Sequence, residues 1–205
     1  MRIIGGHHGG LKLATPRGRE VRPILGRVRE SLFGILRDEV PGARVADLFA
    51  GTGVIGLEAL SRGAEFCTFI ERDQACIATI RENIRRARLE AATRAVRADA
   101  FRAADVLAED GPFDLIFIDP PYRMLRGRRN FERVEGLVAR VGENDLLAEG
   151  GTAVLRFPAD VRVAGHAGPL TQVDRRRYGG MKVALFRRSA SPGAVAKPHG
   201  SELSF

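Results

Sequence analysis

The chain has 205 residues, a length that suits one domain with a full hydrophobic core. Its hydrophobic content is 44%, and no apolar run approaches the roughly 20 residues that span a bilayer. Because the N-terminus also lacks the apolar core of a signal peptide, we expect a cytoplasmic protein with no membrane partner. Cys67 and Cys76 lie in no metal or redox spacing, which predicts buried, reduced thiols. His7 and His8 have no third ligand at metal spacing, so we expect no metal site.

The net charge is +8, with thirty arginines and three lysines. The arginines cluster in the segments 17–29, 123–133 and 175–188. These clusters favour a polyanionic partner such as a nucleic acid, because the neutralisation of phosphates drives that kind of binding. A solvated basic surface is the alternative that charge alone leaves open.

The first forty residues predict a small N-terminal extension outside the main sheet. Residues 2–14 have the pattern of two short strands joined by a glycine-rich turn, a small hairpin. Residues 15–24 have the prolines and glycine of a loop. Apolar residues at helical spacing then predict a helix over 26–39, which ends at Pro41-Gly42.

From residue 45 onward, strands alternate with helices, which predicts an α/β fold with a Rossmann-like, doubly wound, mostly parallel sheet of seven strands. The last two strands flank Gly179-Gly180 and predict an antiparallel C-terminal hairpin at the sheet edge. We expect an extension over 1–40, a main domain over 41–188 and a disordered tail over 189–205. The predicted strands are 45–49, 66–71, 94–97, 113–118, 152–157, 172–178 and 181–187; helices are predicted over 54–61 and 101–107, after Asp73 and around 131–141.

The turn after the first predicted strand contains Gly-x-Gly-x-x-Gly, within Asp-Leu-Phe-Ala-Gly-Thr-Gly-Val-Ile-Gly at 47–56. In that position the backbone N–H groups can approach a ligand at the helix N-terminus. Glu71 ends the second strand, where a carboxylate can accept hydrogen bonds from both ribose hydroxyls of an adenosine. Asp99 follows the third strand, and it can either reach an adenine amino group or cap the helix at Phe101. The residues predicted to bind the cofactor are Asp47, Phe49, Ala50, Gly51, Gly53, Glu71, Arg72, Asp99 and Ala100.

The fourth predicted strand, 113–118, is nearly unbroken in its apolar character and stops at Asp-Pro-Pro-Tyr. The two prolines force a rigid exit from the sheet at the carboxyl end of a strand, where α/β sheets bind ligands. Hydride transfer has no use for this tetrapeptide, whereas methyl transfer to an exocyclic amine does. Asp119 and the Pro120 carbonyl can each accept one amine N–H, and Tyr122 can stack on a planar base. The predicted catalytic residues are Asp119, Pro120, Pro121 and Tyr122.

Together, the glycine loop, the acid that ends the second strand and Asp-Pro-Pro-Tyr resemble the motifs of class I S-adenosylmethionine-dependent methyltransferases. Within that class, the chain resembles the RsmD family, which methylates the N2 amine of one guanine in small-subunit (16S) ribosomal RNA. The matches run through 2–6, 22–23, 27–33, 47–56, 57–63, 71–73 and 113–122, and the N-terminal block is far more specific than the shared cofactor motifs. The chain departs from the family pattern at Gly9 and Leu11, where basic residues are usual, and around Gly26.

The resemblance implies S-adenosyl-L-methionine as the cofactor and ribosomal RNA as the partner, either naked or within an assembling small subunit. We expect a monomer in which Arg22, Arg27, Arg123 and Arg126 contact the RNA backbone. Methylation of another planar amine stays open: adenine N6 or cytosine N4 in DNA, or glutamine in a protein. A non-catalytic RNA-binding factor is the alternative from a different class.

Overall fold

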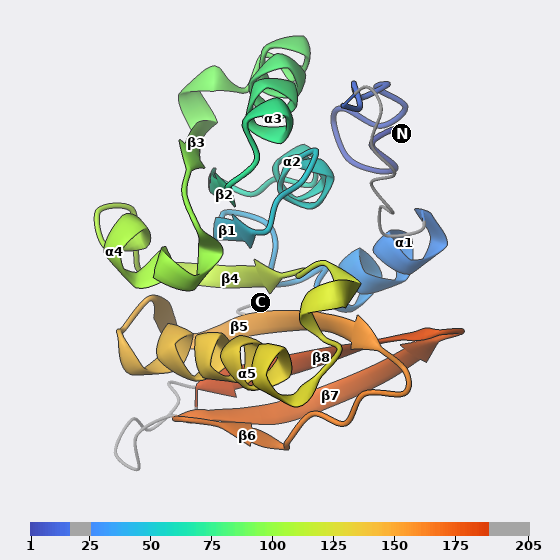
Figure 1. The fold of residues 1–205 in the computed structure, drawn as a ribbon. Helices are drawn as coiled ribbons and strands as arrows, with labels where there is room; N and C mark the ends of the chain where they lie inside the picture. Colours follow the sequence, from blue (N-terminus) through green and yellow to red (C-terminus); the bar gives the residue numbers. More distant parts are fainter. Residues whose placement is uncertain (17–25, 189–205) are drawn as a thin grey trace, which may run out of the picture.

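The computed structural model describes residues 1–16 and 26–188, so the predictions for Arg22 and for the tail 189–205 lie outside the described residues. The centre of the molecule is a sheet of eight strands in the order β3-β2-β1-β4-β5-β8-β7-β6 (Figure 1). The strands β3, β2, β1, β4 and β5 run parallel to one another, and β8, β7 and β6 add antiparallel neighbours beyond β5. This arrangement confirms the predicted fold class. The strands are β1 Arg44–Leu48, β2 Phe66–Glu71, β3 Thr93–Arg97, β4 Phe113–Ile118, β5 Leu147–Pro158, β6 His166–Ala167, β7 Leu170–Tyr178 and β8 Met181–Arg188.

Helices cover both faces of the sheet, and a separate apolar cluster fills each interface. The first face carries α1 (Gly26–Ile35), α2 (Val54–Ser61) and α3 (Gln74–Ala87), and the second carries α4 (Ala103–Leu107) and α5 (Arg128–Glu143). Three short 3-10 turns complete the order: η1 Glu90–Ala92, η2 Ala100–Arg102 and η3 Tyr122–Met124. Of the helices in the two described ranges, none combines the length and the apolar character needed to cross a bilayer.

Several elements differ from the predictions: β5 begins at Leu147 instead of at 152, and the predicted helix 101–107 is divided between η2 and α4. The sheet has an eighth strand, β6, whose two residues fold back on β7 and are too few to give a sequence pattern. The N-terminal hairpin is reduced to one bridge between Arg2 and Lys12, because its glycine-rich turn hydrogen-bonds to α2 instead of extending a ladder. Helix α1 ends at Ile35, and the predicted residues up to Glu39 continue as hydrogen-bonded turns.

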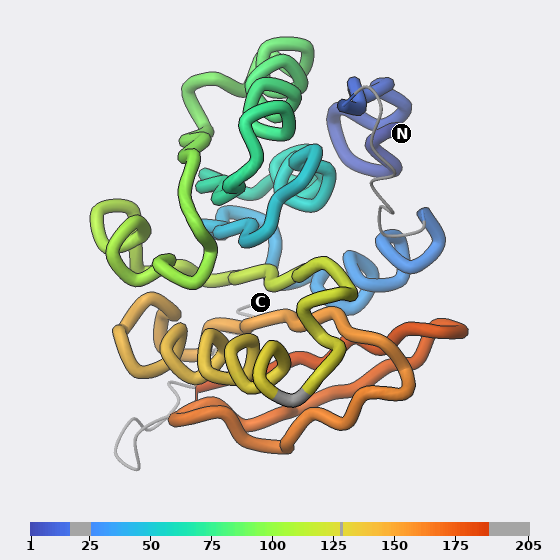
Figure 2. Tube along the Cα trace, viewed as in Figure 1, coloured from blue at the N-terminus to red at the C-terminus, as the bar shows by residue number. Residues whose placement is uncertain are grey.

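The N-terminal segment is fastened to α2, which lies beside it although the two are far apart in the sequence (Figure 2). The fully buried Glu58 carboxylate accepts hydrogen bonds from the backbone N–H groups of Ile4 and Gly5, at 2.8 and 2.9 Å. It also pairs with the Nε atoms of Arg29 and Arg62, at 3.1 and 2.8 Å. A buried carboxylate is tolerated only with such partners, so these donors fix the segment on the helix.

Helix α2 lies unusually close to β2, and Gly56 makes that approach possible. A Cβ atom at this position would lie 2.4 Å from Cε1 of Phe69 and 2.5 Å from the sulfur of Cys67. Both neighbours are fully buried, so neither can move aside without disturbing the core. The third glycine of the motif is therefore needed for helix–strand packing.

Substitution of Gly56 by Ala should destabilise the fold by about 1–3 kcal/mol, because the added methyl group overpacks a rigid interface. Gly34 is the matched control, since it is also helical and a Cβ atom there would meet no atom of the described chain within 4 Å. Gly34→Ala should instead stabilise the fold by up to about 1 kcal/mol. Chemical denaturation measures both free energies of unfolding, and equal effects of the two variants would contradict the account.

Candidate active site

The carboxyl ends of neighbouring parallel strands bring the predicted site residues to one edge of the sheet (Figure 1). Asp47 lies near the end of β1, and Glu71 ends β2. Asp99 lies two residues beyond β3, and Asp119 directly follows β4. Residues that are far apart in the sequence thus meet where α/β sheets bind ligands.

The glycine loop between β1 and α2 is held in shape by Glu71. Gly51 and Gly53 have positive φ angles of 56° and 76°, which glycine adopts at little cost. The Gly51 N–H donates to Oε2 of Glu71 at 3.0 Å, and the Asp73 N–H donates to Oε1 at 2.9 Å. Because a carboxylate has about four acceptor positions, Glu71 can accept two further hydroxyl groups from a ligand.

Asp47 is almost completely buried beside this loop. Its Oδ2 accepts a hydrogen bond from the Gly56 N–H at 3.0 Å, whereas its buried Oδ1 has no partner among the described residues. Burial raises the pKa of Asp47 to about 8, against the effect of the Gly56 hydrogen bond, and the charges of Asp119 and Glu71 add to the rise. A cation bound at this edge would lower that pKa and favour the ionised form.

Two phenylalanines join the loops that follow β1 and β3. Phe49 has a φ of 61°, a left-handed conformation that is uncommon for a residue with a side chain. Its ring packs edge-on against Phe101, with the ring centroids 5.6 Å apart, and the Arg133 guanidinium lies 4.2 Å from the Phe101 centroid. This packing stabilises a backbone conformation that costs free energy on its own.

The other predicted cofactor residues lie around the same loops. Asp99 takes the capping role, since its Oδ1 accepts the Phe101 N–H at 3.1 Å. Ala100 is buried beside it, and Ala50 anchors the first loop by donating its N–H to the Ile70 carbonyl at 3.1 Å. Arg72 is exposed, so its side chain lies at the outer rim of the site.

The Asp-Pro-Pro-Tyr segment leaves the sheet beside the end of β1. The Asp119 N–H donates to the Leu48 carbonyl at 3.3 Å, and the Asp119 side chain is 15% exposed. Pro120 is buried, while Pro121 begins the η3 turn and accepts the Met124 N–H at 2.8 Å. Tyr122 is half-buried and packs against both apolar clusters. The carboxylate and the ring are thus held on a short, hydrogen-bonded turn.

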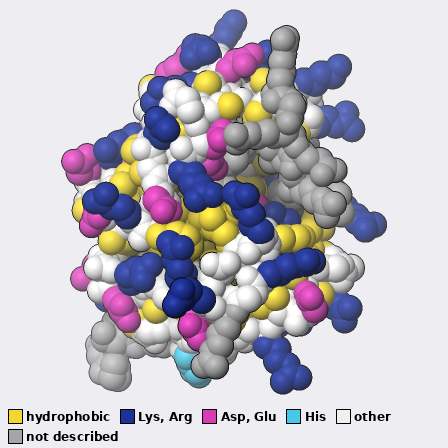
Figure 3. Space-filling model, viewed as in Figure 1, with side chains coloured by type: hydrophobic (Ala, Val, Ile, Leu, Met, Phe, Trp, Pro, Cys, Tyr) yellow, Lys and Arg dark blue, Asp and Glu magenta, His cyan; other side chains and the backbone are white. Residues whose placement is uncertain are grey.

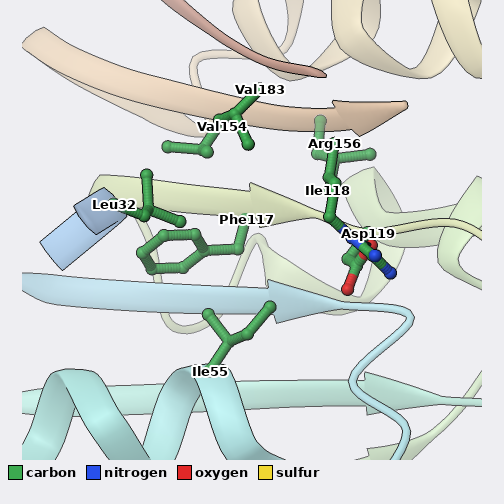
Figure 4. Close-up of a pocket in the computed structure, with 8 residues that line it drawn as sticks. All are labelled: Leu32, Ile55, Phe117, Ile118, Asp119, Val154, Arg156 and Val183. Carbon is green, nitrogen blue, oxygen red and sulfur yellow. Dashed lines mark hydrogen bonds and ion pairs between the residues drawn. The ribbon is translucent and has the colours of Figure 1, made fainter. Parts of the chain in front are cut away.

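A residue that the sequence analysis missed completes this corner. Arg156, on β5, donates from Nε to Oδ1 of Asp119 and from Nη1 to the Tyr122 hydroxyl at 3.3 Å. Figure 4 shows Asp119 and Arg156 facing each other at the carboxyl ends of their strands. Burial raises the pKa of Asp119 above its usual range, and the Arg156 guanidinium offsets part of that rise.

The sequence did hold a signal for Arg156. It is the one charged residue in the predicted strand 152–157, which is otherwise apolar or neutral. In the structure Ile118, the last residue of β4, pairs with Leu155 on β5. The residues that follow them are Asp119 and Arg156, which therefore lie side by side. Without that register, an isolated arginine in a buried strand has no identifiable partner.

The predicted RNA-binding arginines that the structure describes are all exposed. Arg123 follows Tyr122 within η3, and Arg126 lies just beyond that turn. Arg27 lies in the first turn of α1. Figure 3 shows many Lys and Arg side chains around the middle of one face, next to a patch of apolar atoms. In the described ranges, no group of three His, Cys, Asp or Glu residues is arranged to hold a metal ion.

Comparison with known proteins places this geometry in a family. A family model described as "Conserved hypothetical protein 95" matches residues 1–187. A Bacillus subtilis protein, "Putative rRNA methyltransferase YlbH", is 33% identical over 189 residues, which is 92% of this chain and 99% of that protein. The Escherichia coli "Ribosomal RNA small subunit methyltransferase D" is 42% identical over 124 residues, which is 60% of this chain and 61% of that protein.

Solved structures agree with the sequence matches. The structure of "Putative methyltransferase yhhF" from Escherichia coli superimposes with a TM-score of 0.76 and is 32% identical. That match covers 93% of this chain and 99% of the other chain. Because the family model covers nearly all of the described chain, the resemblance to the RsmD family is confirmed, and this chain belongs to the family described as Conserved hypothetical protein 95.

Proposed function

We propose that this protein transfers a methyl group from S-adenosyl-L-methionine to the exocyclic N2 amine of a guanine in small-subunit ribosomal RNA. The observation that carries the proposal is the position of the Asp119 carboxylate. It lies at the same strand edge as the glycine loop and Glu71, in a chain whose relatives include rRNA methyltransferases. A binding module without catalytic activity would need no such acceptor beside a cofactor loop.

The residues of this edge fit S-adenosylmethionine, which supplies an electrophilic methyl group on a positively charged sulfur. The carboxyl groups of Asp47, Glu71 and Asp119 lie near each other. The pKa of Asp47 is raised by its burial and by the charges of Asp119 and Glu71. The unpartnered Oδ1 of Asp47 and the unused acceptor positions of Glu71 suit a ligand that brings positive charge and hydroxyl groups. The adenine of the cofactor would lie against Asp99, Ala100 and the Phe49 ring. Arg72 would contact the cofactor at the outer rim of the site.

Asp119 and Pro120 would orient the amine. The lone pair of an exocyclic amine is delocalised into the base, and it becomes available when the N–H groups are held by acceptors. Asp119 Oδ2 makes no hydrogen bond with a described residue, so it is open to accept one N–H, and the Pro120 carbonyl would accept the other. As the nitrogen–carbon bond forms and the bond between the methyl group and the sulfur breaks, the electron pair would stay on sulfur and positive charge would develop on nitrogen, where the Asp119 carboxylate would stabilise it. The methylated nitrogen then loses its proton to solvent.

We propose that the exposed arginines near Tyr122 and the extension over 1–40 face the RNA. Tyr122 would stack on a base turned out of its helix, at an unstacking cost of a few kcal/mol that phosphate contacts must offset. We propose that the protein acts on its substrate as a monomer. A ribosomal RNA substrate also implies a cytoplasmic protein, and it leaves naked RNA and the assembling small subunit as the two forms to compare.

Asp119→Ala should reduce methyl transfer by at least about 100-fold, because the amine loses an oriented acceptor. Its affinity for S-adenosylhomocysteine should stay within a few-fold of the wild-type value. Asp114→Ala is the matched control, since this exposed carboxylate lies on the same strand at the opposite end, and it should retain full activity. Transfer of a radiolabelled methyl group to ribosomal RNA measures both, and unchanged turnover of the Asp119 variant would rule out its role.

Glu71→Ala should weaken cofactor binding by about 10- to 100-fold, because it removes a charged acceptor and releases the Gly51 N–H that shapes the loop. Glu65→Ala, an exposed change just before the amino end of the same strand, should bind the cofactor normally. Isothermal titration calorimetry gives both affinities. Equal binding by the two variants would remove Glu71 from the cofactor site.

RNA binding should weaken steeply as salt is added, since phosphate neutralisation releases counterions. The double variant Arg123→Gln, Arg126→Gln should lower the slope of log K against log salt by about 1 to 2. Arg37→Gln is the control, because Arg37 is also exposed but pairs with Asp38. A flat salt response in the wild-type protein would mean that the basic clusters are only a solvated surface.

A further inference from the structure

Arg156 is a buried cation to which the proposed reaction gives no role of its own. Its side chain is 10% exposed, and it extends from a strand whose neighbouring positions, Leu155 and Phe157, are apolar and fully buried. A guanidinium in such a position costs free energy unless its donors are satisfied. Its charged and hydroxyl partners in the described chain are two residues of the Asp-Pro-Pro-Tyr segment.

One guanidinium spans the first and last residues of that segment. Nε donates to Asp119 Oδ1, Nη1 donates to the Tyr122 hydroxyl at 3.3 Å, and the guanidinium carbon lies 5.2 Å from the Tyr122 ring centroid. The planar fork of arginine can hold both groups at once, which a lysine ammonium cannot do with the same directionality. The positions of the carboxylate and of the ring are therefore linked through a single side chain.

Among the described residues, the surroundings offer no other side-chain donor that fixes the Asp119 carboxylate. Beside the ion pair, a small cavity is lined by apolar side chains from α1, α2, β4, β5 and β8 (Figure 4). They are Leu32, Ile55, Phe117, Ile118, Val154 and Val183. None of these side chains can donate a hydrogen bond, so the orientation of Asp119 depends on Arg156.

The charge balance at this edge points the same way. Burial disfavours the ionised form of the Asp119 carboxylate, and the charges of Asp119 and Glu71 in turn raise the pKa of Asp47 on β1. Arg156 on β5 supplies the opposing positive charge, and Tyr122 is its hydroxyl neighbour. A protonated Asp119 would carry a hydrogen on one oxygen and would lose acceptor capacity toward an amine.

We propose that Arg156 is a positioning residue for the proposed methyl transfer. It holds Asp119 ionised, directs Oδ2 toward the amine and braces the protein-facing side of Tyr122 so that the other side is open to the base. This role rests on the proposed function, but its physical content, the ionisation of Asp119, can be measured without any methyl transfer.

The first measurement is the titration of Asp119 by carbon-detected NMR of protein labelled at the aspartate carboxyl groups. The Asp119→Asn variant identifies the resonance. In Arg156→Gln the apparent pKa of Asp119 should rise by about 1 to 3, because an adjacent opposite charge lowers an aspartate pKa by that amount. Arg94→Gln is the matched control. Arg94, on β3 of the same sheet, forms an ion pair with Asp110 away from the carboxyl-end edge, so its loss should leave the pKa of Asp119 unchanged.

The second measurement is the pH profile of methyl transfer. Activity requires ionised Asp119, so a higher pKa moves the acid limb of the kcat profile toward higher pH in Arg156→Gln. At the plateau, kcat should fall by about 10- to 100-fold from lost orientation, with little change in cofactor affinity. Arg156→Lys should restore the acid limb, because it restores the charge, but should recover only part of kcat, because it cannot hold both groups.

The outcomes separate the two proposals. If the wild-type protein transfers no methyl group, the proposed function fails while the NMR titration still tests Arg156. The role of Arg156 would be overturned if the Asp119 pKa and the acid limb of the kcat profile both stay unchanged in Arg156→Gln. This holds even if activity falls, because a loss of activity alone can come from a weakened fold. Thermal unfolding of each variant identifies that case.

Discussion

Asp47, Glu71 and Asp119 place three carboxyl groups at the ends of neighbouring strands, and burial leaves little water to solvate Asp47 and Asp119. The desolvation raises the pKa of Asp47 and that of Asp119, and mutual repulsion adds to the rise at Asp47. One buried guanidinium, Arg156, opposes this charge from β5. An edge that is short of positive charge suits a cationic ligand, which is what S-adenosylmethionine would bring.

The rest of the fold holds that edge in place. Glu58 and Ser61 fasten the N-terminal segment to α2, and Gly56 lets the same helix lie against β2. Asn83 on α3 donates to the Thr52 carbonyl at 3.0 Å and to the Ala14 carbonyl at 3.2 Å, so it joins the glycine loop to the N-terminal segment. The matches at 2–6 and 27–33 contact α2, the helix that follows the glycine loop, through Glu58.

Local patterns in the sequence predicted the parts of the site that depend on local structure. The strand that stops before Pro120, the glycines of the loop and the start of α3 after Asp73 each follow from backbone chemistry within a few residues. Arg156 and Glu58 depend instead on strand register and on which helix covers which face, and a single sequence does not show either. The N-terminal hairpin was overestimated for the same reason, since part of its turn hydrogen-bonds to α2 and its two arms share a single bridge.

The central claim is that the amine acceptor at Asp119 acts on guanine N2 in small-subunit ribosomal RNA. The most direct test incubates the protein with S-adenosylmethionine and with small-subunit RNA lacking its natural methylations, naked or assembled into particles. The RNA is then digested to nucleosides for mass analysis. The account predicts N2-methylguanosine at a single position, and no such product with the Asp119→Ala variant. Methyl groups on adenine N6 or cytosine N4, or only on protein, would contradict it.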